Sequence, residues 1–257
     1  MKHRKNDHVD LAFSFKERVK HLLVPPRLYI RYIAYKEKMR GERELSLLPH
    51  LVERRKISID IGANKGAYTY FLSKLSREVL AFEPNPRIFP ILEKAVAANV
   101  TAYPVALSDR SGVATFRIPK GKKGLSNQRG TLSEILTDEP YSEIEVETRR
   151  LGDYGLSNIG FIKIDVEGFE QHVIEGAKDT IRENRPILLV EIEEMHTGQS
   201  LEDSLQKITA LGYRCVFIFR GALHTLGRFD IQKHNRTTKK DGTKLEEYVF
   251  NYIFLPE

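Results

Sequence analysis

The 257-residue sequence predicts an α/β fold with a mostly parallel sheet and helices on both faces. From Ile57 onward, short apolar runs alternate with longer amphipathic stretches, a pattern typical of strand–helix–strand units. Several of the apolar runs end in a glycine-bearing turn or on a carboxylate. The composition, 41% hydrophobic and 30% charged, is ordinary for a globular protein. The length suits one substantial domain with an extension.

Seven strands are expected, and the last two have no helix between them. Such neighbours pair antiparallel, because parallel strands need a crossover connection. Five parallel strands closed by an antiparallel pair form the Rossmann-like plan of class I methyltransferases. The expected strands are Ile57–Ile61, Val79–Glu83, Val100–Ala106, Phe161–Asp165, Ile187–Ile192, Arg214–Phe219 and Tyr248–Phe254. The expected helices lie near Tyr68–Ser76, Ile88–Asn99, Glu170–Ala177 and Ser200–Leu211.

Two insertions interrupt this plan. The segment Asp109–Asn158 contains two stretches of alternating polarity, which predict an inserted β-hairpin around residues 110–158, over the ligand crevice. The segment Gly221–Lys244 is expected to be a long basic loop between the last two strands. Loops of this length are usually either functional or disordered.

Residues 1–55 are predicted to form a basic helical extension, and residues 56–257 the catalytic domain. Pro25 and Pro26 separate the first two helices of the extension. Pro49 is expected to stop the third helix before the first strand. The three helices are expected near Leu11–Leu23, Arg27–Arg40 and Glu42–Leu48.

The positive charge is concentrated in the extension. The net charge is +6, yet residues 1–56 carry 15 Lys and Arg against 7 Asp and Glu, while the remainder carries 26 against 28. A catalytic domain that is not basic argues against a nucleic-acid partner. The helix at Arg27–Arg40 either packs on the domain with its basic residues solvated, or presents a basic-aromatic surface to anionic membrane or a polyanion.

The cellular compartment is predicted from what the chain lacks. No stretch reaches the roughly 20 apolar residues of a transmembrane helix. The single cysteine, Cys215, cannot form an internal disulfide, which suits the cytosol. We therefore expect a cytoplasmic protein, with peripheral binding at the inner face of the membrane as an open alternative.

The first motif, I-S-I-D-I-G-A-N-K-G, spans Ile57–Gly66. Gly62 would let the backbone approach a ligand, and Gly66 would let the next helix pack closely on the strand. Asp60 is expected to hold the turn or the amino group of a methionine moiety. Asn64 stands where a dinucleotide fingerprint has its second glycine, which argues against NAD.

The second and third motifs follow the next two strands. Glu83 ends a strand 23 residues after Asp60, where a carboxylate can accept hydrogen bonds from both ribose hydroxyls. Pro84 fixes the turn behind it. In V-A-L-S-D, the backbone of Ala106–Ser108 and the carboxylate of Asp109 are candidate contacts for adenine, although Asp109 could instead only initiate an Asx turn.

The fourth motif, F-I-K-I-D-V-E-G-F-E, places Lys163, Asp165 and Glu167 at alternate positions. A central parallel strand should be apolar on both faces. Buried charges cost several kcal/mol unless they are paired. The conflict indicates either a functional site or a structural ion pair. Glu191 and His196 add polar groups at the end of the following strand.

Together these segments resemble the FkbM-type family of S-adenosylmethionine-dependent methyltransferases, from about Glu42 to Glu194. The resemblance rests on I-D-I-G-A-N-K-G, A-F-E-P-N-P, A-L-S-D, K-I-D-V-E-G-F-E and R-P-I-L-L-V-E-I, in that order. It implies S-adenosylmethionine as cofactor. It also implies O-methylation, commonly of a sugar hydroxyl in a glycan, glycolipid or glycosylated metabolite.

The site residues follow from the motifs and the resemblance together. A base for the acceptor hydroxyl is expected among Asp165, Glu167, Glu191 and His196. A divalent metal held by Asp165 and Glu191 is less favoured, because two carboxylates without evident further ligands make a poor site. Cofactor contacts are expected from Asp60, Gly62, Ala63, Asn64, Gly66, Glu83, Pro84, Ala106, Leu107, Ser108, Asp109 and Asp165.

Two other functions compete with this one. The isoelectric point of 9.2 would suit an RNA 2′-O-methyltransferase, whose binding should be steeply salt-dependent. A non-enzymatic, cofactor-binding adaptor would instead bind S-adenosylmethionine without transferring its methyl group. The sequence specifies neither the acceptor hydroxyl nor the oligomeric state.

Overall fold

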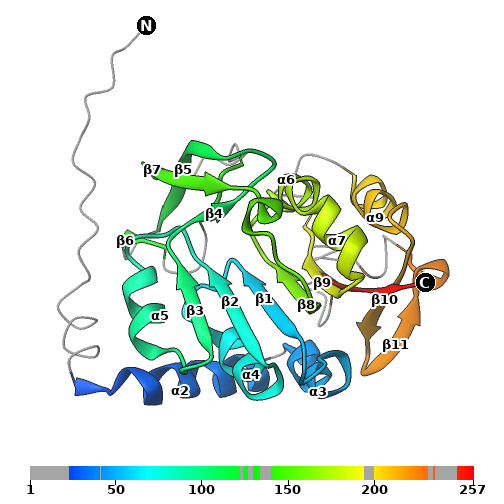
Figure 1. Ribbon diagram of the computed structural model, residues 1–257, viewed down its shortest axis with the longest axis horizontal. Coiled ribbons are helices and arrows are strands. Elements are labelled where there is room, and N and C mark those ends of the chain that lie inside the picture. The colour runs from blue at the N-terminus through cyan, green and yellow to red at the C-terminus, as the bar shows by residue number, and fades with distance from the viewer. Residues whose placement is uncertain are drawn as a thin grey trace, which may run out of the picture.

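The computed structural model describes residues 23–40, 42–121, 124–126, 130–133, 140–193, 200–230, 234 and 248–257 (Figure 1). The expected helix at Leu11–Leu23 lies almost wholly outside these residues. The helices are α2 (Pro26–Arg40), α3 (Leu48–Leu51), α4 (Ala67–Leu75), α5 (Phe89–Ala95), α6 (Glu170–Gly176), α7 (Lys178–Asn184) and α9 (Leu201–Thr209). The strands are β1 (Ile57–Ile61), β2 (Glu78–Phe82), β3 (Val100–Tyr103), β4 (Ala106–Leu107), β5 (Gly112–Gly121), β6 (Gly124–Leu125), β7 (Tyr141–Arg149), β8 (Ile159–Ile164), β9 (Ile187–Glu191), β10 (Tyr213–Phe219), β11 (Ala222–Thr225) and β12 (Asn251–Pro256).

The main sheet confirms the predicted fold class. Its strand order is β11-β10-β12-β9-β8-β1-β2-β3. The five strands from β9 to β3 run parallel, and β12 is antiparallel to both β9 and β10. The order reverses beside β1, so ligands should bind outside the carboxyl ends of β1, β2 and β8.

The sheet has an eighth strand that the sequence analysis missed. Arg220 and Gly221 both have positive φ, 51° and 75°, which is the geometry of a two-residue hairpin turn. The turn folds β11 back on β10, with Phe219 opposite Ala222. The beginning of the expected loop Gly221–Lys244 is therefore a strand, followed by a 3₁₀ turn at Leu226–Arg228.

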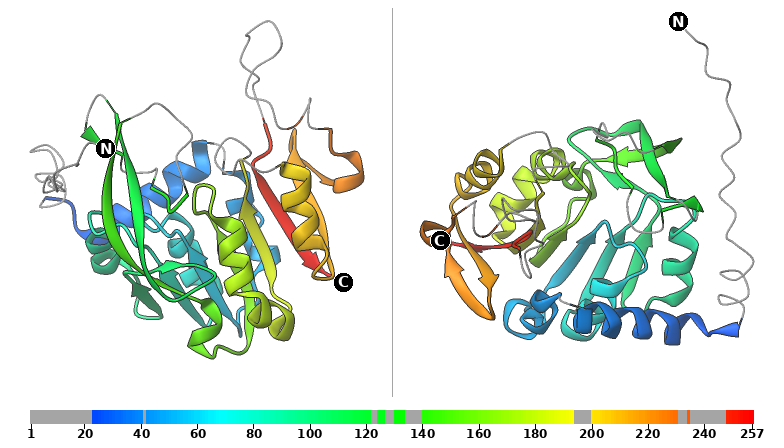
Figure 2. Two further views of the ribbon diagram at one scale, coloured as in Figure 1. Left: turned by 90° about the horizontal axis from the view of Figure 1, so that it is seen from above. Right: turned by 180° about the vertical axis from the view of Figure 1, so that it is seen from behind.

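The expected strand Val100–Ala106 is two strands. Pro104 has no backbone N–H to donate to a ladder, so β3 ends at Tyr103. β4 then leaves the main sheet and pairs with β7. β7 and β5 form an antiparallel pair, and the second sheet has the order β4-β7-β5-β6. Figure 2 (left) shows the green β5–β7 pair standing beside the main sheet.

Helices cover both faces of the main sheet. One face packs on α6, α7 and α9 through residues such as Val173, Ile181 and Leu205. The other face packs on α3 and α4 through Leu48 and Leu72. The expected helix Glu170–Ala177 is α6, and α7, which follows it at once, was not expected from the sequence. The expected third helix, Glu42–Leu48, is instead a 3₁₀ turn at Arg43–Ser46 followed by the short helix α3. Pro49 does not stop a helix here. It lies in the first turn of α3, where a missing backbone N–H costs no hydrogen bond.

Helix α2 has an inner face that belongs to the core. Tyr29, Ile30, Ile33 and Ala34 are buried, and α2 contacts both α4 and α5. Figure 1 shows it running beneath these two helices. Burying such a side chain contributes roughly 1.5–3 kcal/mol. The described part of the extension is therefore packed on the sheet domain, while the division at residue 55 stays a prediction.

None of the helices within the described ranges is long and apolar enough to cross a membrane.

Candidate functional site

A cavity of about 320 Å³ lies at the carboxyl ends of β1, β2, β8 and β9. Its wall also includes part of α2 and, from the second sheet and its connection, Phe116, Gly130 and Leu132. Among the residues that the sequence predicted for the site, the wall contains Asp60, Gly62, Ala63, Asn64, Glu83, Pro84, Ala106, Leu107, Asp165, Glu167 and Glu191. Three others, Gly66, Ser108 and Asp109, are not in the wall. His196 lies outside the described residues.

The turn after β1 requires glycine at its first position. Gly62 has φ +78°, and a Cβ there would lie 1.8 Å from the carbonyl oxygen of Asp165. The backbone N–H groups of Gly62 and Ala63 both donate to the carbonyl of Phe82, at 2.9 Å. The turn therefore joins the ends of β1, β2 and β8. These three strand ends approach so closely that a side chain at position 62 would collide with the backbone of Asp165.

Gly66 has a packing role instead. Its φ is +86°, and a Cβ there would lie 2.6 Å from Cδ1 of Ile30 and 2.8 Å from Cδ1 of Leu92. The bare glycine thus lets α2 and α5 close on the start of α4. Its expected contact with a cofactor stays a prediction.

Asp60 is buried at the end of β1 and accepts a hydrogen bond from Thr69 Oγ1. Burial raises its pKa to about 6, although the Thr69 hydroxyl and the nearby Lys163 both act to lower it. A bound cation next to Asp60 would favour the ionised form further.

Glu83 is held in the cavity wall by hydrogen bonds from two backbone N–H groups. Its Oε2 accepts the backbone N–H of Asn64, and its Oε1 accepts that of Asn85, both at 2.8 Å. These bonds fix the carboxylate in the cavity wall, where burial raises its pKa to about 7. Each oxygen has a second lone pair, so the same carboxylate is still able to accept two further hydrogen bonds.

Lys163 supports the opposite side of the cavity. It is fully buried, and its Nζ lies 3.6 Å from Asp165 Oδ2 and 3.8 Å from Glu191 Oε2. Asn251 Oδ1 accepts from Nζ at 3.3 Å. The alternating charges of this strand indicated either a functional site or a structural ion pair. The structure has the ion pair, and both carboxylates also belong to the cavity wall.

The charges of this cluster are strongly coupled. Burial lowers the pKa of Lys163, but Asp165 and Glu191 act in the other direction and leave it above its ordinary value. Burial and the neighbouring Asp165 together hold the pKa of Glu191 well above its ordinary range, against the pull of Lys163. A buried lysine that stays protonated thus anchors one carboxylate that is more basic than usual.

Two residues beneath Lys163 were not found from the sequence. The Nζ of Lys163 lies 5.0 Å from the centre of the Tyr68 ring, within the range of a cation–π contact. The Tyr68 hydroxyl donates to Glu42 Oε2 at 2.9 Å. Glu42 and Tyr68 both belong to the cavity wall, as do Ile33, Lys36 and Glu37. No sequence motif marks these residues, because the packing of α2 and α4 brings them there.

The loop after β8 is held in an unusual conformation. Glu167 and Gly168 have φ of 53° and 93°, and left-handed backbone at a non-glycine residue is uncommon. Glu170 Oε1 accepts the Gly168 N–H at 2.8 Å. From the connection between β6 and β7, Ser133 donates to the Gly168 carbonyl and Thr131 to that of Val166. Strained backbone fixed in this way is frequent at functional sites.

Ser108 and Asp109 are used elsewhere. The Ser108 N–H donates to the carbonyl of Arg149 at 2.9 Å, and its hydroxyl donates to Asp109 Oδ1. A Cβ at Gly176 would lie 1.9 Å from the Ser108 carbonyl oxygen, so this segment packs directly on α6. The backbone of Ala106 and Leu107 remains beside the cavity, whereas a contact of Ser108 or Asp109 with adenine stays a prediction.

No group of three or more His, Cys, Asp or Glu side chains within the described ranges is arranged to hold a metal ion. The ammonium of Lys163 lies within 4 Å of both Asp165 and Glu191, the two proposed ligands.

Comparison with known proteins identifies the family. The model of the methyltransferase FkbM domain matches residues 60–215. The 2-O-methyltransferase NoeI of Sinorhizobium fredii is 30% identical over an alignment of 161 residues, and the match covers 56% of this chain and 66% of that protein. Methyltransferase sdnD of Sordaria araneosa is 26% identical, covering 47% and 60%. A crystal structure of methyltransferase FkbM from Methylobacillus flagellatus superposes with a TM-score of 0.49 at 17% identity, covering 93% of this chain and 57% of that one.

The chain spans less than two thirds of the length of each of these relatives. The matched region nevertheless contains the turn after β1, Glu83, the Lys163 cluster and the loop after β8. Because the family model matches more than half of the sequence, the chain belongs to the methyltransferase FkbM domain family.

Proposed function

We propose that the protein is an S-adenosylmethionine-dependent O-methyltransferase that acts on a sugar hydroxyl of a glycan, glycolipid or glycosylated metabolite. The observation that carries the proposal is the pairing, in one cavity, of a glycine turn with a carboxylate that still has two acceptor positions. Gly62 and Glu83 provide this pair.

The residues present fit S-adenosylmethionine. Glu83 would accept hydrogen bonds from the two ribose hydroxyls, and the methionine moiety would lie along the backbone of the turn at Gly62 and Ala63, which is part of the cavity wall. Asp60 and Glu42 lie in the same wall and would face its ammonium group. The adenine would lie along Ala106 and Leu107. When bound, this cofactor supplies an electrophilic methyl group.

The chain's own residues must then orient and deprotonate the acceptor. Orientation of two reactants is worth roughly 7–11 kcal/mol, and a positioned base about 10²–10⁴-fold in rate. Glu191 suits the role of base, because its raised pKa makes it a stronger base than an ordinary carboxylate and it belongs to the cavity wall. It would take the proton of the acceptor hydroxyl. Asp165 and Glu167 line the same side and would bind neighbouring hydroxyls.

Two observations support a sugar as the acceptor: the carboxylates of the cavity wall and the similarity to NoeI. Adjacent carboxylates such as Asp165, Glu167 and Glu191 are suitable acceptors for the several hydroxyls of a sugar. NoeI is named a 2-O-methyltransferase, which is transfer to an oxygen. We place the protein in the cytoplasm, since its single cysteine, Cys215, is buried and unpaired.

The decisive experiment measures transfer of labelled methyl from S-adenosylmethionine into fractionated glycans and glycolipids, followed by linkage analysis. Glu191→Gln should lower turnover by about 10² or more with little change in cofactor affinity. Glu175→Gln, at an exposed residue that is not part of the cavity wall, is the matched control. Normal turnover of Glu191→Gln would reject this residue as the base and direct attention to Asp165, Glu167 and His196.

Other outcomes would point to the competing functions. Labelling of RNA at 2′-hydroxyls, with binding that weakens steeply with salt, would replace the sugar by RNA. Cofactor binding without transfer to any fraction would indicate an adaptor.

A further inference from the structure

The outer face of α2 carries an unusual concentration of exposed apolar side chains. Leu28, Tyr32, Tyr35 and Met39 are 57, 57, 46 and 87% exposed, and they line a shallow groove together with Arg31 and Lys36. Scattered single apolar residues on a surface need no explanation, but a contiguous group marks an interaction site. We call these six residues the α2 outer face.

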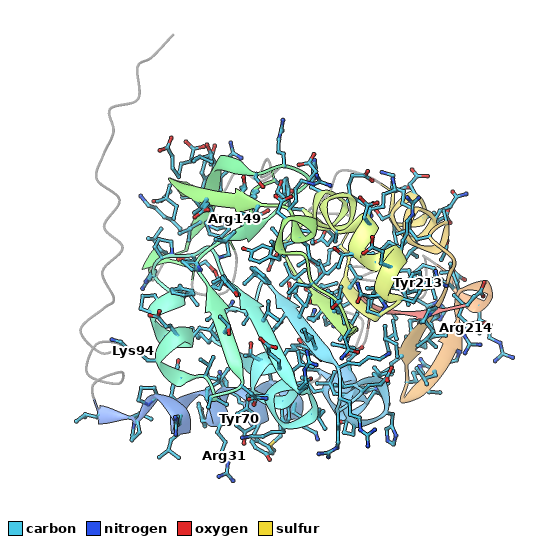
Figure 3. All side chains as sticks on the ribbon, viewed as in Figure 1. Arg31, Tyr70, Lys94, Arg149, Tyr213 and Arg214 are labelled. Atoms are coloured by element: carbon cyan, nitrogen blue, oxygen red, sulfur yellow. The ribbon has the colours of Figure 1, made fainter. Side chains whose placement is uncertain are left out.

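Basic side chains lie on this face and beside it, since Arg31 and Lys36 belong to the α2 outer face while Arg27, Lys38 and Lys74 lie outside it. Arg27 and Arg31 are exposed on α2, and Figure 3 shows Arg31 extending away from the helix at the lower edge of the molecule. Arg31 lies 5.9 Å from the centre of the Tyr35 ring, and Lys38 lies 5.7 Å from that of Phe71 on α4. On the same helix Lys74 lies 5.4 Å from the centre of the Tyr70 ring. Cationic groups therefore lie beside aromatic rings across α2 and α4.

Acidic residues do not neutralise this helix. The only acidic residue of α2 is Glu37, which lies in the wall of the catalytic cavity and 3.9 Å from Lys36. Its carboxylate is therefore on the inner side. Basic side chains that flank exposed aromatic and aliphatic ones are the composition of helices that lie in a membrane interface, where the apolar groups enter the headgroup region and the cations meet anionic lipid.

We propose that the α2 outer face docks the protein on the surface of an anionic lipid bilayer. Charge complementarity favours this partner, since anionic lipids attract Arg31 on the α2 outer face and the exposed Arg27 and Lys38 on the same helix. The apolar side chains select a bilayer over a soluble polyanion, because RNA or heparin offers little to Leu28 and Met39. Lys36 lines both the groove and the catalytic cavity, so docking places the bilayer beside one wall of that cavity.

Flotation of the full chain with vesicles tests the proposal independently of any catalytic activity. We expect binding to phosphatidylcholine vesicles that contain phosphatidylglycerol, and much weaker binding to phosphatidylcholine alone. The double variant Arg27→Gln/Arg31→Gln should lower binding by about tenfold or more, because each basic residue near the surface is worth several-fold. Its matched control is Arg182→Gln/Arg214→Gln, two exposed arginines on α7 and β10.

The apolar part of the face has its own test. Leu28→Gln/Met39→Gln should also lower vesicle binding by about tenfold, whereas Val113→Gln/Leu223→Gln, at 68 and 58% exposure, should not. Equal binding to neutral and anionic vesicles, or equal losses in the control pairs, would overturn the proposal. So would binding to heparin or RNA that depends on the arginines but is unchanged by Leu28→Gln/Met39→Gln, which would indicate a soluble polyanion.

Discussion

The strongest test of the cofactor site is the substitution Glu83→Gln. Both carboxylate oxygens already accept a backbone N–H at 2.8 Å, and each has one lone pair left for a ribose hydroxyl. Glutamine keeps the shape but has one oxygen and no charge, so at least one acceptor position is lost. A hydrogen bond to a charged group is worth about 1.5–3 kcal/mol. We expect roughly 10- to 150-fold weaker binding of S-adenosylmethionine.

The pH dependence adds a second signature. Burial raises the pKa of Glu83 to about 7, so below that pH the ligand-free site holds a proton that must leave before two hydroxyls can donate. The affinity of the wild type should therefore fall about tenfold for each pH unit below about 7. Glu83→Gln should lose this dependence. Any remaining change near pH 6 belongs to Asp60, whose pKa burial raises to about 6.

Isothermal titration calorimetry between about pH 5 and pH 8 measures both effects. Glu44→Gln is the matched control, because Glu44 is also buried, its pKa is also raised by burial to about 7, and it is not part of the cavity wall. Its affinity profile should follow that of the wild type. A folded Glu83→Gln variant with unchanged affinity at every pH would refute the ribose assignment.

Three further predictions concern the turn, the charge cluster and stability. Gly62→Ala should abolish cofactor binding in the same titrations, since its Cβ would lie 1.8 Å from the backbone carbonyl oxygen of Asp165. Its control is Gly221→Ala, also at positive φ but with open space around it, which should bind the cofactor normally. Lys163→Met should lower the free energy of unfolding by about 1.5–3 kcal/mol in urea titrations, because Asp165 and Glu191, whose side chains are 34 and 22% exposed, lose the buried charged group that they contact. A loss below 1 kcal/mol would mean that the cluster is solvated. Glu44 has a folded-state pKa above its unfolded value, so its contribution to stability is complete below about pH 4.5 and is lost as the pH rises through about 7. Glu44→Gln should therefore gain melting temperature relative to the wild type between about pH 5 and pH 8, and a constant difference would contradict the shift.

The sequence by itself determined the sheet and the rim of the site. Alternating strand and helix periods require a parallel sheet, and the carboxyl ends of parallel strands share one edge. Residues at or just beyond strand ends, such as Asp60, Glu83, Asp165 and Glu191, were therefore certain to meet once the strands were correctly placed. Gly62 was predictable for a similar reason, since a turn at the end of a strand leaves a signature in adjacent residues.

Local chemistry also explains where the sequence analysis went wrong. The pattern at Val100–Ala106 favoured one strand, but Pro104 cannot donate to the ladder and the chain leaves the sheet there. Arg220 does not look like a turn residue, so the hairpin that forms β11 was read as part of a loop. In both cases the backbone conformation at a single residue, Pro104 or Arg220, decided the secondary structure against the polarity pattern of the surrounding residues.

Only the tertiary structure decided which residues contact and support the side chains at the strand ends. Lys163 meets Asn251, 88 residues away, and Tyr68 meets Glu42 across the junction of α4 and the extension. Such pairs depend on how helices pack on the sheet, and packing is set by the shapes of many side chains at once rather than by a local period. Helix packing also explains why one side of α2 lines the cavity while the other side is exposed. The sequence of α2 shows which of its residues are apolar. Only the packing of Ile30 against Gly66 and Leu92 decides which of these residues face inward.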